Sequence, residues 1–106
     1  MNSLENFVHY NKLLETYGLL LTDSQREMME LYYEFNLSLA EIAENKGISR
    51  SAVSDALKKA SQALENYENK LKIIENNAKI DDLLEKIENS NNLKDIKKLV
   101  NDFKRN

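Results

Sequence analysis

The chain contains no proline and only two glycines among its 106 residues. These two residue types supply most of the turns that β-structure and coil require, so their scarcity favours helices. No segment shows the alternation of apolar and polar residues that is typical of strands, whereas apolar residues recur at helical spacing almost throughout. The length suits one compact domain. The sequence therefore predicts an all-α fold in one structural domain.

Capping signals place the first two helices. Ser3 is a favourable N-cap for a helix over residues 4–16, and Gly18 follows its end. Thr22 and Gln25 form the Thr-x-x-Gln capping box of a second helix. Helical spacing predicts apolar faces made of Leu4, Phe7, Val8, Leu14 and Tyr17 in the first helix and Met28, Leu31, Tyr32 and Phe35 in the second.

Residues 38–59 have the layout of a helix-turn-helix. Ser38 begins a second capping box and a short helix that ends at Gly47, and Ser49 caps the next helix almost at once. Ala43 is small where the two helices cross, and Gly47 can adopt the left-handed backbone of the turn. We predict that two further apolar residues, Ile48 and Val53, hold the second helix on the first. Two packed helices at a plain αα-corner are the alternative, but spacing, capping and basic surface together favour the helix-turn-helix.

The second helix of this unit presents a polar face that we call the recognition face. In a helix-turn-helix such a face enters the major groove of DNA. Arg50 is its one residue able to make a bidentate contact with guanine, and Asp55 would repel phosphate. The predicted nucleic-acid-binding residues are Ser49, Arg50, Ser51, Ser54, Asp55, Lys58 and Lys59.

The net charge of −3 divides unevenly along the chain. Residues 1–45 carry eight acidic and two basic side chains, a net charge of −6, so residues 46–106 carry +3. Residues 46–59 hold four basic side chains and one acidic one. Four bases give a salt dependence of slope about −4 at most, so a single domain would bind DNA weakly at physiological salt. The sequence thus predicts either a dimer or a partner other than DNA.

The helix that begins after Ser49 meets no breaker until Asn76, which predicts a rod of about 40 Å. Apolar or small residues recur along it in alternating steps of four and three, a heptad pattern. We predict a homodimer through this seam, with coverage by the first helix and a C-terminal helical hairpin of the same chain as the alternative. The hairpin is expected from the apolar patterns of residues 80–87 and 93–103 on either side of a polar loop. The dimer or packing seam comprises Leu57, Ala60, Leu64, Tyr67, Leu71 and Ile74, and the pattern extends to Val53 and Ala78.

The predicted organisation is a helical core at residues 1–62, with the helix-turn-helix at residues 38–59, followed by a helical extension and tail at residues 63–106. The tail would pack on the core, on a dimer partner, or on both.

Four segments of the core closely resemble region 4 of bacterial sigma factors, which grips the promoter −35 element. Lys46 departs from that pattern because the position is usually apolar, and Asp55 stands where promoter-reading domains often carry a base or an amide. The segments are Leu21-Thr22-x-x-Gln25-Arg26-Glu27, Leu31-Tyr32, Leu37-Ser38-Leu39-x-Glu41-Ile42-Ala43-Glu44 and Gly47-Ile48-Ser49-Arg50-Ser51-Ala52-Val53-Ser54.

A likeness over nearly the whole chain is to the YlxM family of small bacterial proteins. These proteins share the sigma-like core, a Tyr-Glu-x-Lys-Leu segment (Tyr67 to Leu71 here) and a charged helical tail. The resemblance implies a DNA-binding regulator associated with the signal recognition particle, with DNA or the particle's RNA, and also its protein, as partners. An adaptor that binds proteins without sequence-specific DNA affinity and a sigma-like transcription regulator are the competing hypotheses.

Other classes of function receive little support. There is no cysteine, no phosphate-cradling glycine loop and no catalytic triad pattern, so we expect no enzyme, no cofactor and no metal site. His9 reads as a surface or partly packed histidine, the acidic residues near Asp81 as favourable charges at a helix start, and Tyr32, Tyr33 and Tyr67 as core or seam aromatics. The start of the chain lacks the features of a signal peptide and no apolar run would span a membrane, so a cytoplasmic location is expected.

Overall fold

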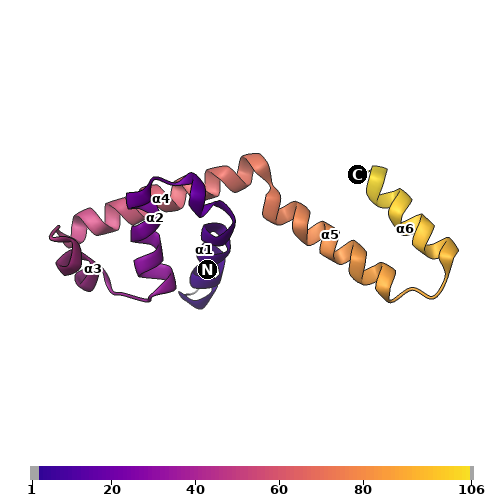
Figure 1. Cartoon of the computed structure of the whole chain (residues 1–106), viewed down its shortest axis with the longest axis horizontal. Helices are drawn as coiled ribbons and strands as arrows, with labels where there is room; N and C mark the ends of the chain where they lie inside the picture. Colours follow the sequence, from indigo (N-terminus) through magenta and orange to yellow (C-terminus); the bar gives the residue numbers. More distant parts are fainter. Residues whose placement is uncertain (1–2, 106) are drawn as a thin grey trace. The chain divides into compact units, whose positions relative to one another are not determined.

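The structure is a computed structural model that describes residues 3–105, with the side chain of Ser3 left outside the description. Those residues contain no strand, which confirms the all-α fold (Figure 1). The predicted capping role of Ser3 lies outside the described residues. The chain forms two compact units, Met1–Lys72 and Ile73–Asn106. The elements are α1 (Ser3–Tyr17), η1 (Gly18–Leu20), α2 (Asp23–Met29), η2 (Glu30–Glu34), α3 (Leu39–Lys46), α4 (Arg50–Leu71), α5 (Ile73–Glu88) and α6 (Leu93–Arg105).

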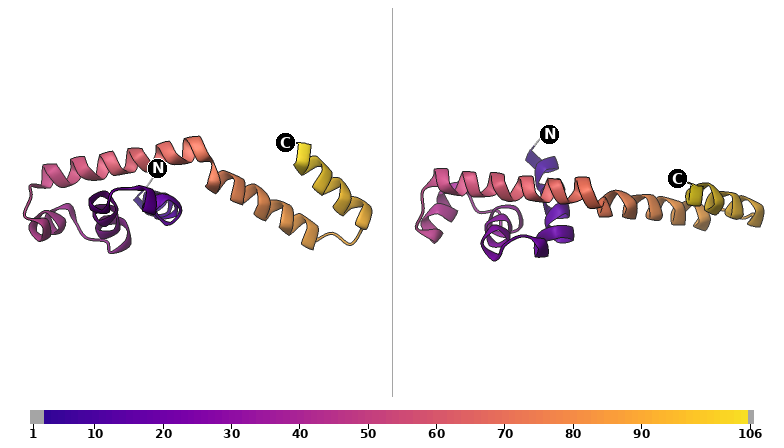
Figure 2. Two further views of the ribbon diagram at one scale, coloured as in Figure 1. Left: turned by 45° about the horizontal axis from the view of Figure 1, so that its top comes forward. Right: turned by 90° about the horizontal axis from the view of Figure 1, so that it is seen from above.

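Within the first unit, α4 is the element on which the other helices pack. Its 22 residues give a length of about 33 Å. Helices α1, α2 and α3 all contact α4 and lie on the same side of it (Figure 1), and α1 crosses it in the view from above in Figure 2. The predicted seam supplies the α4 side of this core, because Leu57, Ala60 and Leu64 are buried within the single chain. The other buried apolar residues are Leu13, Leu14, Tyr17, Leu21, Met28, Met29, Ile42, Ala43 and Val53.

Helix α1 buries a different face from the one its sequence predicts. Leu14 and Tyr17 are buried as expected, but Leu4 and Val8 are 73% and 65% exposed, and Leu13, which the prediction omitted, is buried. Helical spacing allows neighbouring stripes to serve as the core face, and α1, which packs on α4 and η2, buries the stripe that contains Leu13. The prediction for Leu4 and Val8 was therefore wrong. Near its start, α1 is held by Phe7, whose ring stacks on that of Tyr32 with centroids 5.7 Å apart.

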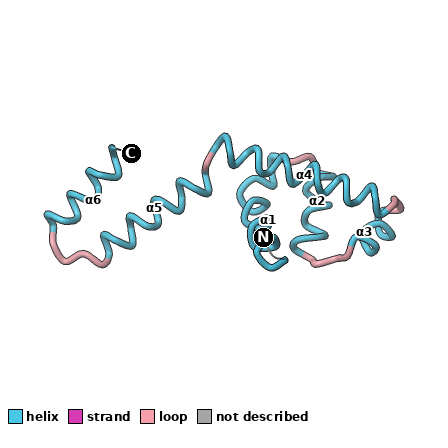
Figure 3. Tube along the Cα trace, turned by 180° about the vertical axis from the view of Figure 1, so that it is seen from behind, coloured by secondary structure: helices cyan, strands magenta, loops and turns pink. Residues whose placement is uncertain are grey.

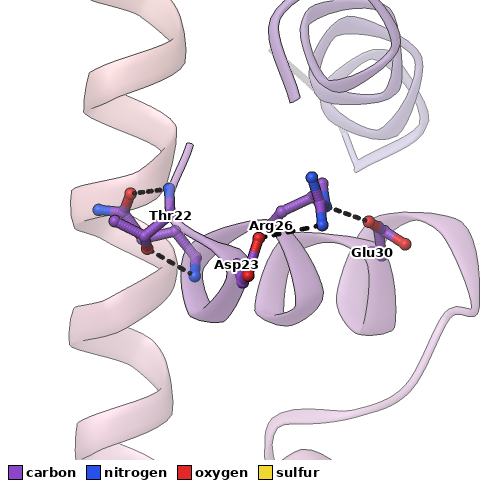
Figure 4. A network of polar contacts seen from close by, with 5 residues as sticks. Thr22, Asp23, Arg26 and Glu30 are labelled. Carbon is purple, nitrogen blue, oxygen red and sulfur yellow. Dashed lines mark hydrogen bonds and ion pairs between the residues drawn. The ribbon is translucent and has the colours of Figure 1, made fainter. Parts of the chain in front are cut away.

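Helix α2 begins at the predicted capping box and then widens. The Thr22 hydroxyl accepts a hydrogen bond from the Gln25 backbone N–H at 3.1 Å, and the Gln25 side chain accepts one from the Thr22 N–H (Figure 4). The helix continues as the π-helical segment η2. A π-turn holds more residues than an α-turn and so rotates the residues that follow. Phe35, which follows η2 and which the 3.6-residue spacing placed in the core, is 62% exposed, whereas Met29, the last residue of α2, is buried.

The long helix ends earlier than the sequence predicts. Lys72 adopts a left-handed backbone with φ of 54°, and it separates α4 from α5 by a short non-helical step (Figure 3). The expected continuation to Asn76 was wrong because nothing in the residue type of Lys72 signals a break: left-handed geometry usually falls to glycine or asparagine. The seam residues Leu71 and Ile74 lie on opposite sides of this break.

The second unit is the predicted helical hairpin. Helices α5 and α6 contact each other and are joined by a polar loop at residues 89–92. Helix α5 begins at Ile73, seven residues before the first apolar residue of the predicted pattern. None of the described side chains of this unit is buried.

Candidate nucleic-acid interface

The turn between α3 and α4 is built by local hydrogen bonds. Gly47 has φ of 69°, a left-handed conformation that side chains resist. Its N–H donates to the Glu44 carbonyl and the Ile48 N–H to the Ala43 carbonyl, the pattern of a Schellman motif. Ala43 and Val53 are buried at the contact of the two helices as predicted, but Ile48 is 41% exposed, so it contributes less to that contact than expected.

Both helices of this unit have the predicted caps. The Ser38 hydroxyl accepts a hydrogen bond from the Glu41 N–H, and the Glu41 carboxylate accepts one from the Ser38 N–H, which completes the capping box of α3. These bonds, the backbone one above all, lower the pKa of Glu41 below its ordinary value. Ser49 caps α4 by accepting a hydrogen bond from the Ala52 N–H at 3.0 Å. The direction in which α4 leaves the turn is thereby defined.

All seven residues of the recognition face are exposed to solvent. They occupy the cap and first three turns of α4, on the side opposite Val53 and Leu57, which are buried against the other helices. Of the seven, Ser49 uses its hydroxyl to cap the helix, which leaves Ser51 and Ser54 as the hydroxyl groups not used in a cap. The structure thus brings the predicted set together on one surface.

Ion pairs reduce the number of basic side chains on this surface that lack a partner. Lys59 lies 3.1 Å from the Asp55 carboxylate one turn earlier on α4, and Lys46 pairs with Glu27 of α2. Arg50 and Lys58 make no ion pair with any residue in the described range 3–105. Exposed pairs of this kind are weak and exchange readily, so Lys59 can still turn to a phosphate at small cost.

Arg26 of the acidic N-terminal region is also occupied. Its guanidinium lies 3.2 Å from Asp23, three residues earlier in α2, and 3.4 Å from Glu30, four residues later at the start of η2 (Figure 4). This arginine therefore does not add to the basic surface.

A shallow groove of about 940 Å³ lies beside the recognition face. Its lining includes Ser54, Lys58 and Lys59 of α4, Tyr10 of α1, and Tyr32 and Tyr33 of η2. Burial, followed by the charge of Glu65, raises the pKa of Tyr10, and burial also raises that of Tyr33. The sequence interpretation treated Tyr32 and Tyr33 as core aromatics and did not single out Tyr10. The groove depends on how α1 and η2 approach α4, which residue spacing does not reveal.

Two other polar contacts join helices of the first unit to one another. The His9 ring lies 2.5 Å from the Glu65 carboxylate, which joins α1 to α4, and the Tyr67 hydroxyl donates to the Leu20 carbonyl at 3.2 Å. Residues 3–105 contain no cluster of three histidine or acidic side chains placed to hold a metal ion. No described helix is both long enough and apolar enough to cross a membrane.

Residues 4–103 match the model of the UPF0122 family, whose description is "Putative helix-turn-helix protein, YlxM / p13 like". The chain belongs to the YlxM family. This membership confirms the resemblance to the YlxM family, which is described as a family of helix-turn-helix proteins.

Relatives of this family share almost half of the aligned residues. A UPF0122 protein of Clostridium acetobutylicum is 42% identical over 80 residues, which are 76% of this chain and 69% of the relative. One from Caldanaerobacter subterraneus subsp. tengcongensis is 45% identical over 83 residues, or 78% and 71% of the two chains. The UPF0122 protein YofM of Lactococcus lactis is 45% identical over 84 residues, or 79% and 76%.

Proposed function

We propose that this YlxM-family chain is a nucleic-acid-binding regulatory protein of the cytoplasm that works as a homodimer. Its recognition face would bind through Arg50, Ser51, Ser54, Lys58 and Lys59. The observation that carries the proposal is the exposed, capped start of α4, where Arg50 and Lys58 have no ion-pair partner among residues 3–105. Guanidinium and ammonium groups on such a helix bind phosphates and base edges.

A dimer follows from the small number of these basic groups. Two unpartnered bases per chain, with Lys59 as a third, neutralise few phosphates, and affinity rises with each phosphate neutralised. A twofold pair doubles that number and supplies two recognition helices, which suits successive major grooves about 34 Å apart.

The pathway that we propose is that of the signal recognition particle. The family resemblance supports it, and the ligand would then be DNA or the RNA of that particle. Co-purification from the native host, with nuclease treatment before and after capture, distinguishes nucleic-acid partners from protein partners. If neither the RNA nor the protein of the particle co-purifies, with or without nuclease treatment, the association is contradicted.

Replacing Arg50 by alanine tests the recognition face. Arg50→Ala removes the one bidentate donor there, so affinity for random-sequence duplex DNA, or for transcribed signal recognition particle RNA of the host, should fall about fivefold or more. Fluorescence anisotropy at low salt measures the change. Lys12→Ala, which removes an exposed base of α1, is the matched control and should bind as the unaltered protein does. Equal affinity of Arg50→Ala and Lys12→Ala for both ligands would contradict the assignment of the recognition face as the binding site.

A protein-binding adaptor is the second candidate, and the contact of Lys59 with Asp55 favours it. That pair places an acidic group on the recognition face and engages one of its bases. An adaptor would bind the particle's protein with no measurable affinity for either nucleic acid in the same anisotropy titrations.

A further inference from the structure

The hairpin of α5 and α6 carries more apolar surface than two helices can enclose. Five of its apolar side chains reach only partial burial: Ile74, Leu83, Ile87, Ile96 and Leu99. A second set is more exposed: Ile80 at 43%, Leu84 at 55%, Leu93 at 66%, Val100 at 37% and Phe103 at 37%. A groove of about 790 Å³ between the two helices is lined in part by Ile80, Leu83, Leu99 and Phe103.

Exposed apolar surface of this extent has a thermodynamic consequence. Helices of this length are marginal in water by themselves, and their stability in proteins comes mainly from burial of an apolar face. Two helices share only one contact surface, so apolar side chains on the outer flank of each helix stay exposed to solvent. A third or fourth helix laid over the groove would bury both flanks.

The charges of the hairpin indicate which helices these would be. Helix α5 carries five acidic and two basic side chains, a net charge of −3, whereas α6 carries five basic and two acidic ones, a net charge of +3. The hairpin as a whole is therefore neutral but strongly divided between its helices. A surface divided in this way is complementary to a copy of itself turned by a twofold axis.

The unpaired charges lie beside the exposed apolar residues. Within α5, Lys79 pairs with Glu75 and Lys86 with Asp82. Three acidic side chains of α5 make no ion pair in the described part of the chain, and at helical spacing they flank Leu84. On α6, lysines without an ion pair there flank Leu93 and Val100 in the same way, three of them in its first two turns. These charged residues are Asp81, Glu85 and Glu88 on α5 and Lys94, Lys97 and Lys98 on α6.

We infer that the hairpin of a second copy of this chain covers this groove, with α5 of each copy against α6 of the other in a four-helix bundle. The apolar flanks form the centre of the bundle, and the acidic triplet of one copy lies opposite the lysine triplet of the other. Charged residues that flank an apolar contact set the choice of partner in helical bundles in this manner. The inference deepens the proposed homodimer by naming its contact, and it does not depend on nucleic-acid binding.

Charge reversal in the full chain tests the contact. We expect the unaltered protein to sediment as a dimer at about 100 µM. Asp81→Lys with Glu85→Lys and Glu88→Lys, or Lys94→Glu with Lys97→Glu and Lys98→Glu, places like charges opposite each other, and each triple variant should raise the dimer dissociation constant about tenfold or more. Circular dichroism on each variant shows whether the helices remain.

Mixing the two triple variants keeps the test independent of folding defects. An equimolar mixture restores opposite charges across the contact, so it should form a heterodimer even where each variant alone is monomeric. Reversal of three exposed acids of the first unit, Glu15→Lys with Glu34→Lys and Glu44→Lys, is the matched control and should leave the dimer intact.

Three results would overturn the inference. If the unaltered protein is monomeric at about 100 µM, both the proposed homodimer and the hairpin contact are contradicted. A dimer that neither triple variant weakens would remove only the hairpin contact and leave the proposed homodimer in place. Failure of the mixture to associate would also remove the contact. Anisotropy with Arg50→Ala remains a separate measure of nucleic-acid binding.

Discussion

At the scale of single residues, Asp55 has the largest influence on what the recognition face can bind. It is exposed on that face and lies 3.1 Å from the Lys59 ammonium. The carboxylate thus has two effects of the same sign: it repels phosphate directly and it competes with phosphate for a lysine. Both effects are electrostatic, so both depend on salt.

Replacing Asp55 by asparagine should strengthen nucleic-acid binding. Asp55→Asn removes one negative charge and releases Lys59, so affinity for duplex DNA or particle RNA at low salt should rise several-fold, and the slope of log affinity against log salt should steepen by about one. Anisotropy titrations over a range of salt concentrations give both quantities. An unchanged slope would mean that Lys59 does not reach a phosphate.

Glu41 gives the capping box of α3 a dependence on pH. Because hydrogen bonds from Ser38 hold the folded pKa below the ordinary value of 4.5, the charged form stabilises the fold fully above pH 4.5, and this contribution is lost as pH falls through the folded pKa. Glu41→Gln keeps a side-chain acceptor but no charge at the helix start. Urea unfolding should give the unaltered protein a higher free energy of unfolding than Glu41→Gln at pH 7, and this difference should shrink well below pH 4.5. A difference that is the same at both pH values would contradict this account.

At the scale of elements, the helix-turn-helix depends on one backbone conformation. Gly47 has φ of 69°, and a Cβ added there would meet no atom within 4 Å. The requirement for glycine is thus conformational and not steric. Lys72 has a similar φ of 54° without being glycine, so the two turns differ in how well their residue type suits them.

Alanine at position 47 should destabilise the first unit without disturbing its packing. Gly47→Ala places a side chain in the left-handed region and should cost about 1 to 2 kcal/mol of unfolding free energy. Gly47→Asn is the matched control, because asparagine tolerates this conformation, and it should cost less. Chemical denaturation measures both variants. Equal losses would point to a role of the glycine other than its backbone angle.

At the scale of the whole molecule, the two units differ in how they obtain stability. The first unit contains every buried apolar residue of the described chain, contributed by α1 to α4 and the segments between them. The described part of the second unit contains no buried apolar residue, so the stability of its helices would come from association in the proposed bundle. Folding of the first unit should therefore be independent of protein concentration, whereas folding of the second should not.

Hydrogen exchange should reveal this difference. As protein concentration rises from about 1 µM to about 100 µM, backbone amides of α5 and α6 should exchange more slowly because dimerisation protects them. Amides of α4 up to Leu64 should exchange at the same rate throughout. Exchange in α5 and α6 that does not respond to concentration would show that no second copy protects them.

The starts of α2, α3 and α4 and the helix-turn-helix could be predicted from sequence because they depend on local interactions. Capping boxes join residues three apart, and the turn at Gly47 needs one residue type at one position. The exposed set on the recognition face followed for the same reason: helical spacing from a known start determines which side chains share a side. The i to i+4 contact of Asp55 and Lys59 is equally local.

The sequence by itself therefore determined the helical fold, the caps, the glycine turn and the family. Only the tertiary structure decided that α1 buries Leu13 and leaves Val8 exposed, that η2 turns Phe35 to solvent, that Lys46 pairs with Glu27, and that the long helix breaks at Lys72. The physical reason is range. Capping hydrogen bonds and the glycine turn are set by neighbours in sequence, whereas burial and long-range ion pairs depend on segments that meet only after the chain has folded, and the left-handed backbone of Lys72 falls on a residue type that does not signal it.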